Sequence, residues 1–250
     1  MKITFGSKVA TLTLAALCMM GALGLSASTF AGDASTATAL GFSSDGKSFA
    51  YIEYGYQDGS GFPYAAVKFL DVAKNTYAAP TVSVVKENES ANARQVRYEA
   101  LLKARPALSK LGISKGNIGE LLASRKLTDL SSESTSKVRF SRHPIIRGLT
   151  STEFELSLEE KAARSTRCVM GESPVMMRLT LKNVSSSKSI ELQNDTALPM
   201  SRGCVKGYRI QDVIAREEGD REVIVLLNIF TTGFEGDDSR TIAVSGTLPQ

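Results

Sequence analysis

Residues 39–75 read ALGFSSDGKSFAYIEYGYQDGSGFPYAAVKFLDVAKN, and this stretch determines the fold class. Apolar runs of strand length alternate here with turns made of Ser, Asp, Asn and Gly. These turn residues tolerate positive φ or form hydrogen bonds to their own backbone. The run FAYI at 49–52 is apolar on both faces, which indicates an inner strand of a covered sheet. The stretch therefore predicts an antiparallel β-meander whose first turn is residues 43–46.

Short runs of the same kind return after residue 137 and continue to the C-terminus, separated by turns such as SSSK, EEGD and FEGDD. The run VIVLLNI at 223–229 is the most apolar of them. Many short strands at regular spacing favour antiparallel sheets, in a sandwich-like arrangement or a partial propeller. We therefore predict a mainly β fold with a helical insertion, α+β overall.

The helical insertion is expected at about residues 91–127. From residue 90 the apolar residues recur with the period of a helix. Pro106 is expected to end a first helix and begin a short second one. Asn117 and Glu120 have the spacing of a capping box, so a third helix is predicted after them.

Residues 1–31 have the pattern of a cleaved signal peptide. Lys2 and Lys8 accompany an apolar stretch at 9–28, and small residues precede a possible cut after Ala31. Cuts after residue 27 or 28 fit as well. The stretch is also long enough for a membrane anchor, but its many small residues favour cleavage. No later segment is apolar enough to span a membrane, so we expect one β-rich exported domain at 32–250, periplasmic or secreted.

Export changes the interpretation of the cysteines. Removing the leader leaves Cys168 and Cys204, with no CxxC motif. In an oxidising compartment such a pair indicates one disulfide rather than a metal-binding or catalytic pair.

Charge is uneven along the chain. Residues 86–147 contain 13 Lys and Arg against 6 Asp and Glu, whereas 32–85 contain 3 against 5 and 148–250 contain 12 against 15. A basic region of this kind is typical of a surface for anionic envelope polymers or lipid headgroups, or of a solvated helical face. Nucleic acid is not an expected partner, because the protein is exported and no basic motif interleaved with aromatic residues occurs.

Two resemblances follow from these motifs. GFSSDGKSFAYIEY and VKFLDVAKN resemble a single blade of the TolB-like or WD40-like propellers, but no second blade follows. The order of leader, GFSSDGKSFAYIEYGYQDGSGFPYA, helical segment, GYRIQDV and GFEGDDSRTIAVSG resembles the bacterial family of predicted secreted proteins called domain of unknown function 2259. This second resemblance covers nearly the whole exported chain. It implies an exported protein of unassigned role, and it provides no catalytic residues to carry over.

The sequence offers little catalytic chemistry. His143 is the one histidine, and no GxSxG motif occurs. Zinc requires more nitrogen or sulfur ligands than remain, and we expect no metal or cofactor. Two oxygen-rich turns lack a complete calcium motif. The acidic pairs at 159–160 and 217–218 look like exposed turns. The two oxygen-rich turns are QDGSG, with Asp58 and Ser60, and EGDD, with Glu235, Asp237 and Asp238.

We therefore expect a non-enzymatic exported envelope protein that acts as a binding or structural module, with an envelope protein or an anionic envelope polymer as its partner. The alternatives are a carboxylate-based envelope hydrolase, which needs two converging carboxyls, and a peripheral binder of anionic polymers or membranes through residues 86–147. The candidate binding residues form two groups: Tyr56, Asp58 and Tyr64 around the glycine-rich loop, and Arg94, Arg97, Arg139 and Arg142 in the basic region.

Overall fold

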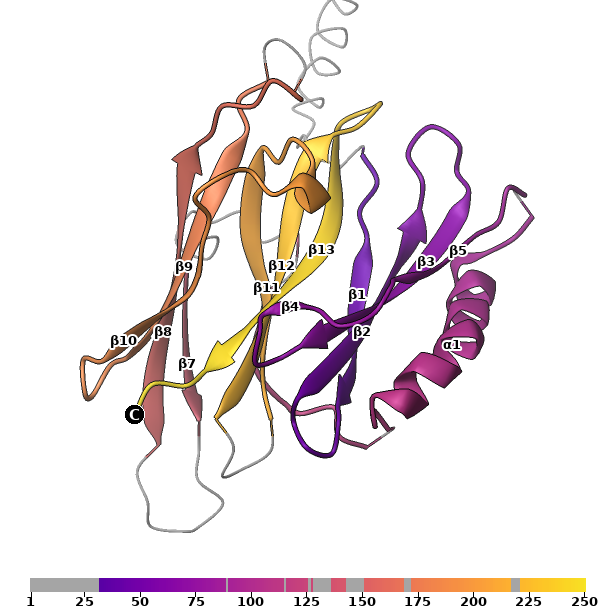
Figure 1. The fold of residues 1–250 in the computed structure, drawn as a ribbon. Helices are drawn as coiled ribbons and strands as arrows, with labels where there is room; N and C mark the ends of the chain where they lie inside the picture. The colour runs from indigo at the N-terminus through magenta and orange to yellow at the C-terminus, as the bar shows by residue number, and fades with distance from the viewer. Residues whose placement is uncertain are drawn as a thin grey trace, which may run out of the picture.

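The computed structural model describes residues 32–88, 90–114, 116–125, 127, 136–142, 151–168, 172–216 and 221–250. These residues form three antiparallel sheets, one α-helix and a short 3-10 helix (Figure 1). The sheets stack face to face, and the α-helix covers the outer face of one of them. The mainly β fold with a helical segment is thus confirmed, in its sandwich-like form. The predicted signal peptide at 1–31 lies outside the described residues.

The first sheet contains the meander predicted from residues 39–75. Its strand order is β1-β2-β3-β4, and β5 also pairs with β3. Residues 76–85 form two short strands on either side of Pro80, which has no N–H to give to the sheet. The strands are β1 (Thr36–Phe42), β2 (Ser48–Tyr56), β3 (Pro63–Asp71), β4 (Thr76–Tyr77) and β5 (Val82–Val85).

Side chains fix the first turn of the meander. Ser43 Oγ donates to Asp45 Oδ1 at 2.7 Å and accepts from the Ser48 N–H at 2.9 Å. Asp45 Oδ1 also accepts from the Lys47 N–H at 3.1 Å. Gly46 has a φ of 74°, in the region that favours glycine. The turn residues therefore have the role that the sequence predicts.

One helix, α1 (Ala93–Lys110), occupies the predicted helical segment, so the expectation of three helices is wrong. Asn92 caps its N-terminus in a capping box with Gln95. Pro106 lies inside the helix instead of ending it. The helix continues past the proline because the following turn, with Leu108, still packs against the first sheet.

The described residues of the segment 113–124, all except 115, form a connection and an edge strand rather than a helix. Asn117 does not cap a helix; its carbonyl accepts from the Phe42 N–H at 2.7 Å. Gly119 has a φ of 87°, and an added Cβ would lie 2.5 Å from the carbonyl oxygen of Ala215. Strand β6 (Glu120–Ser124) then pairs with the second sheet. Left-handed glycines and this edge pairing override the local helical pattern.

The second sheet has the order β13-β12-β11-β6 and the third β10-β9-β8-β7. The second sheet adds β11 (Gly207–Ala215), β12 (Glu222–Thr232) and β13 (Asp237–Thr247). The third consists of β7 (Lys137–Arg142), β8 (Thr152–Ala162), β9 (Val175–Asn183) and β10 (Ser189–Asn194). The 3-10 helix η1 (Met200–Arg202) lies in the connection from β10 to β11.

The second sheet lies between the other two (Figure 1). Alternate residues of β12 face opposite layers: Val225 joins the core shared with the third sheet, and Leu226 the core shared with the first. This double burial explains the continuous apolar run at 223–229. The first sheet is covered in turn by α1, through Val96, Ala100 and Ala104.

The predicted disulfide is confirmed. Cys168, after β8, bonds to Cys204, after η1, with Cα atoms 5.6 Å apart. It joins two connections of the chain that lie 36 residues apart in the sequence.

Candidate functional site

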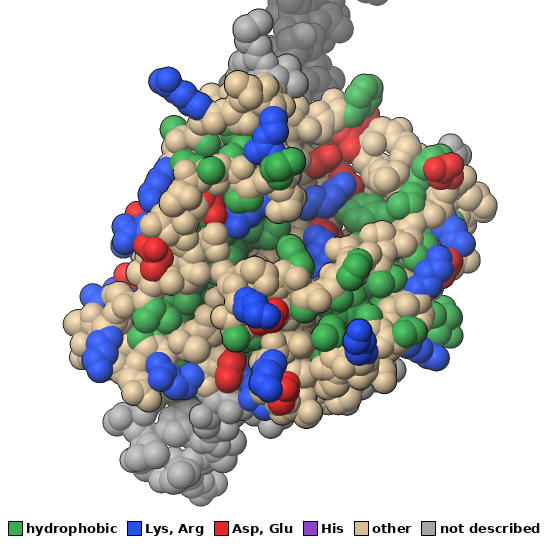
Figure 2. Space-filling model, viewed as in Figure 1, with side chains coloured by type: hydrophobic (Ala, Val, Ile, Leu, Met, Phe, Trp, Pro, Cys, Tyr) green, Lys and Arg blue, Asp and Glu red, His purple; other side chains and the backbone are tan. Residues whose placement is uncertain are grey.

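A cleft of about 770 Å³ opens beside β13, the edge strand of the second sheet. One wall comes from β3, β4 and the turn between them, and the other from η1 and Gln193. Figure 2 shows this face of the molecule hollowed near its centre, with basic and hydrophobic side chains in the hollow. We call it the edge cleft. Its lining includes Lys68, Leu70, Asn75, Tyr77, Arg202, and residues 240–244 of β13.

Three cations line the edge cleft, and each is held by a carboxylate behind it. The carboxylate side chains are at most 3% exposed, and none of them belongs to the lining. Positive groups therefore face the cleft while their counter-ions lie in the protein interior. The pairs are Lys68–Glu53 at 2.5 Å, Arg202–Asp195 at 2.6 Å and Arg240–Asp33 at 2.6 Å.

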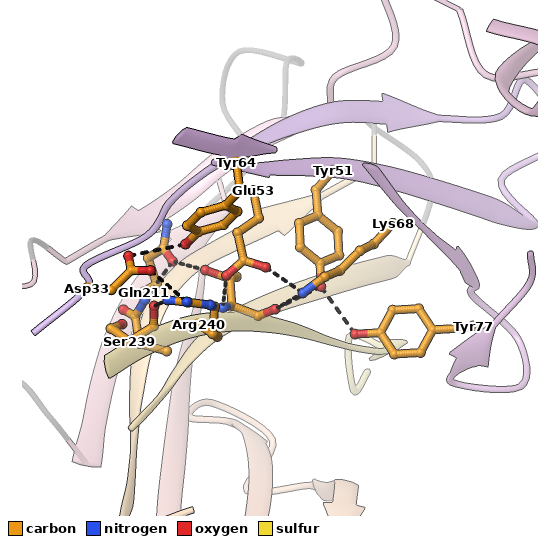
Figure 3. A network of polar contacts seen from close by, with 11 residues as sticks. Asp33, Tyr51, Glu53, Tyr64, Lys68, Tyr77, Gln211, Ser239 and Arg240 are labelled. Atoms are coloured by element: carbon orange, nitrogen blue, oxygen red, sulfur yellow. Dashed lines mark hydrogen bonds and ion pairs between the residues drawn. The ribbon is translucent and has the colours of Figure 1, made fainter. Parts of the chain in front are cut away.

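Side chains of the first sheet meet the backbone of β13 at one end of the cleft (Figure 3). Glu53 Oε1 accepts from the Thr241 N–H at 2.6 Å. The Thr241 carbonyl accepts from Lys68 Nζ at 2.9 Å and from Tyr51 OH at 3.0 Å. Tyr51 OH also lies 3.2 Å from Tyr77 OH. The network holds Lys68 in one position and joins two sheets.

Asp33 anchors the neighbouring part of this network. Its side chain is buried and accepts from Tyr64 OH at 3.3 Å as well as from Arg240. Burial raises the pKa of Asp33, and the nearby Arg240 charge opposes that shift. Burial also raises the pKa of Tyr64. The Arg240 guanidinium lies 4.7 Å from the Tyr64 ring centre, so two contacts orient it.

The cations of the edge cleft are suited to binding anionic groups. Lys68 has three N–H donors, of which Glu53 and Thr241 use two. Among the described residues that line the cleft there is no Asp, Glu, His or Cys. Fixed cations with spare donors favour carboxylate, phosphate or sulfate groups.

The residues predicted around the glycine-rich loop divide between two places. Tyr56 and Asp58 line a shallower hollow of about 310 Å³, also lined by Asp33. Tyr56 OH accepts from the Ala93 N–H at the start of α1, at 3.2 Å. Asp58 Oδ2 accepts from the Glu235 N–H at 2.9 Å. Tyr64 points inward into the network of Figure 3.

The four predicted arginines do not form one surface. Arg94 and Arg97 are on α1, whereas Arg139 and Arg142 are on β7 in the third sheet, with two sheets between them (Figure 1). Arg139 forms an ion pair with Glu155 at 2.8 Å. These four arginines are therefore divided between opposite sides of the described structure.

The two oxygen-rich turns lie side by side, because Asp58 accepts from the backbone of the second turn. Their other carboxylates also have partners: Asp237 pairs with Lys206 at 2.5 Å, and Asp238 accepts from the Asp33 N–H at 3.0 Å. In the described ranges, the group of possible metal ligands that lie close together contains both cysteines of the disulfide, which leaves no thiolate to bind a metal.

The acidic pair Glu159 and Glu160 lies on β8, where neighbouring side chains point to opposite faces. Glu160 Oε1 accepts from the Tyr208 N–H at 2.6 Å. The pair at 217–218 and His143 lie outside the described residues.

The sequence matches the family described as predicted secreted protein, domain of unknown function 2259, over residues 50–247. The chain belongs to this family. Neither a curated protein nor a solved structure matches it. For this family member, no helix among the described residues is both long enough and apolar enough to cross a membrane.

The sequence did not predict the three cations of the edge cleft, because they come from three separate parts of the chain. Arg202 follows β10 and Arg240 lies on β13, with no local pattern to distinguish them. Lys68 and Glu53 do carry a signal: Glu53 is the one charge in β2, and Lys68 is the one charge inside β3, which ends at Asp71. Such isolated charges in adjacent strands indicate a buried pair.

Proposed function

We propose that this exported protein is a non-enzymatic binding module of the cell envelope that takes an anionic ligand in the edge cleft. The observation that carries the proposal is the set of three cations, Lys68, Arg202 and Arg240, each fixed by a buried carboxylate and facing a cleft with no acidic lining residue among those described.

Fixed cations favour binding for two reasons. Their side chains are already ordered, so binding a ligand costs less side-chain conformational entropy than it would with free surface lysines. A cleft lined by one sign of charge also concentrates ligands of the opposite sign. The four predicted arginines of the basic region do not line one cleft, because Arg94 and Arg97 lie on α1 and Arg139 and Arg142 lie on β7.

Family membership supports export, and the finer location, periplasmic or secreted, is part of the proposal. The predicted cut after residue 31 would leave Gly32 as the first residue. Asp33 is buried and bonded to β13, so a leader that ends before it leaves the fold intact. The mass of the exported protein tests the cleavage site.

A carboxylate-based hydrolase would need two carboxyls that converge in a cleft. The buried carboxylates Asp33, Glu53 and Asp195 instead each hold a cation. This arrangement favours binding over hydrolysis.

Calorimetric titration of the exported protein with two anionic polymers, polyglutamate and polygalacturonate, tests the proposal. We expect at least one of them to bind, with an affinity that falls as salt is added. Failure of both to bind the folded wild-type protein would overturn it.

Two paired variants locate the binding site. Arg202→Gln with Asp195→Asn neutralises one cation and its carboxylate in the cleft and should weaken binding about tenfold, the loss of one charge-assisted contact. Lys103→Gln with Glu99→Gln neutralises an ion pair on α1 in the same way and should leave binding unchanged. Both pairs keep the net charge. An equal loss in the two variants would contradict binding in the edge cleft.

A further inference from the structure

The outer edge of β13 presents a row of backbone groups. Residues 239, 241, 243 and 245 alternate with those that bond to β12, so their N–H and C=O groups point away from the second sheet. Most of this row has partners. The Ser239 N–H donates to the Asp33 carbonyl at 2.7 Å, and the Ser245 N–H to Asn75 Oδ1 at 2.8 Å. Thr241 is capped by Glu53, Lys68 and Tyr51.

Ala243 is the exception in this row. Among the described residues, its N–H and C=O have no partner, although it lines the edge cleft. The residue is 8% exposed, and it packs under the first sheet with Leu70 and Leu226, so the strand is held firmly. One residue of a rigid strand therefore presents a free donor and a free acceptor to the cleft.

The surroundings of Ala243 define what fits beside it. Leu70, Ile242 and Val244 supply apolar surface next to it. Lys68 and Arg240 lie toward the Thr241 end of the strand. A ligand that pairs with Ala243 would thus place neighbouring groups against apolar walls and, at one end, against cations.

We infer that the edge cleft binds an extended peptide segment carrying an acidic side chain, which adds to the edge of β13 at Ala243. One ligand residue donates its N–H to the Ala243 carbonyl and accepts the Ala243 N–H with its own carbonyl, as in β-strand addition. The acidic side chain binds Lys68 and Arg240. This inference rests on the proposed function and names its ligand class.

A peptide fits these observations better than a polysaccharide. The paired donor and acceptor of a strand edge match another peptide backbone. Sugar rings would instead need aromatic faces, and in the described lining Tyr77 is the one aromatic residue. The caps at Thr241 and Ser245 limit the pairing to a single residue, which also protects β13 against pairing with further chains.

Hydrogen exchange in the wild-type protein, followed by NMR, tests the inference directly. Without ligand, the Ala243 amide should exchange faster than those of Ile242 and Val244, which bond to β12. Adding a short blocked peptide of alternating Val and Glu should slow exchange at Ala243 by about tenfold or more, as a hydrogen bond forms. Unchanged exchange at Ala243 in the presence of bound peptide would overturn the inference.

Altered ligands and one protein variant separate the contribution of the acidic side chain from that of the backbone hydrogen bonds. The same peptide with Gln in place of Glu, or with N-methylated amides, should bind about tenfold more weakly. Ala243→Pro removes the free N–H without breaking a bond to β12, so it should weaken peptide binding while the protein stays folded by circular dichroism.

Polygalacturonate distinguishes a failure of this inference from a failure of the proposed function. Binding of polygalacturonate in the edge cleft, without binding of the peptide, would overturn the inference and leave the proposed function standing. Binding of neither would overturn both.

Discussion

At the scale of single residues, Asp45 gives a pH dependence whose sign follows from its contacts. The Ser43 hydroxyl and then the Lys47 N–H donate to its carboxylate, and they lower its pKa from 3.8 to about 2. Because the folded-state pKa lies below the unfolded value, the stabilisation is fully present above about pH 4 and is lost as the pH falls toward about 2.

Asp45→Asn should therefore flatten the loss of stability in this acid range, because the carboxamide does not titrate but can still accept both hydrogen bonds. Urea unfolding at a series of pH values measures this difference. Asp212→Asn is a control of opposite sign: burial raises the pKa of Asp212, so its carboxyl favours folding at low pH and opposes it as the pH rises. Parallel curves for wild type and Asp45→Asn would contradict the prediction.

Sequence patterns identify residues whose role is local. The turn with Asp45 and Gly46 was predictable because its contacts lie within a few residues. The disulfide between Cys168 and Cys204 was predictable by elimination. Arg240 was not, because the partner that gives it a fixed position, Asp33, is 207 residues away in the sequence.

At the scale of elements, strands were predicted best where both faces are buried or alternate clearly, as in β12 and β8. The prediction failed at 116–124, where a helical pattern folds as a connection and an edge strand. There the backbone of Asn117 bonds to Phe42, and Gly119 passes close to Ala215. Such contacts with distant strands leave no trace in local periodicity, and tertiary pairing overrides propensity.

The disulfide carries the element-scale prediction. It closes a loop of 36 residues, for which chain entropy gives a stabilisation of about 4 kcal/mol as an upper figure. Replacing Cys168 and Cys204 by serine should lower the free energy of unfolding by about 2–4 kcal/mol, measured with urea. A reductant should lower the wild-type stability by a similar amount and leave the double variant unchanged.

The same variant should also affect the edge cleft. Cys204 lies two residues after Arg202, so the disulfide helps to hold the wall formed by η1. Binding of anionic polymers should weaken while binding of the same polymers by Lys103→Gln with Glu99→Gln stays intact. A double variant as stable as wild type would show that the disulfide does not constrain this part of the chain.

At the scale of the whole molecule, the first and second sheets meet through two different kinds of surface. One end of the interface is apolar, with Phe49, Tyr51 and Leu70 against Ile224 and Leu226. The other end is the polar network of Glu53, Lys68, Asp33 and Arg240 (Figure 3). The apolar end could be predicted as buried from its strands, but the pairing of charges across layers required the fold.

The Asp33–Arg240 pair connects the first described residues to the last strand. Replacing Arg240 should lower the stability by a different amount from replacing Asp33. Arg240→Ala leaves the buried Asp33 carboxylate without a counter-ion and should cost about 3 kcal/mol of stability at neutral pH. Asp33→Ala should cost less, because the Arg240 side chain is 32% exposed and water can solvate it. The double variant should cost less than the sum of the two.

Acid pH should rescue only the Arg240→Ala variant. Burial already raises the pKa of Asp33 against the effect of Arg240, so removing Arg240 raises it further. With its folded-state pKa above the unfolded value, protonated Asp33 favours folding, and this variant should regain stability relative to wild type as the pH falls from neutral toward that pKa. Urea unfolding of the four proteins at neutral and mildly acidic pH measures both effects. Additive costs, or a loss in Arg240→Ala that does not depend on pH, would show that the pair does not hold the two sheets together as a unit.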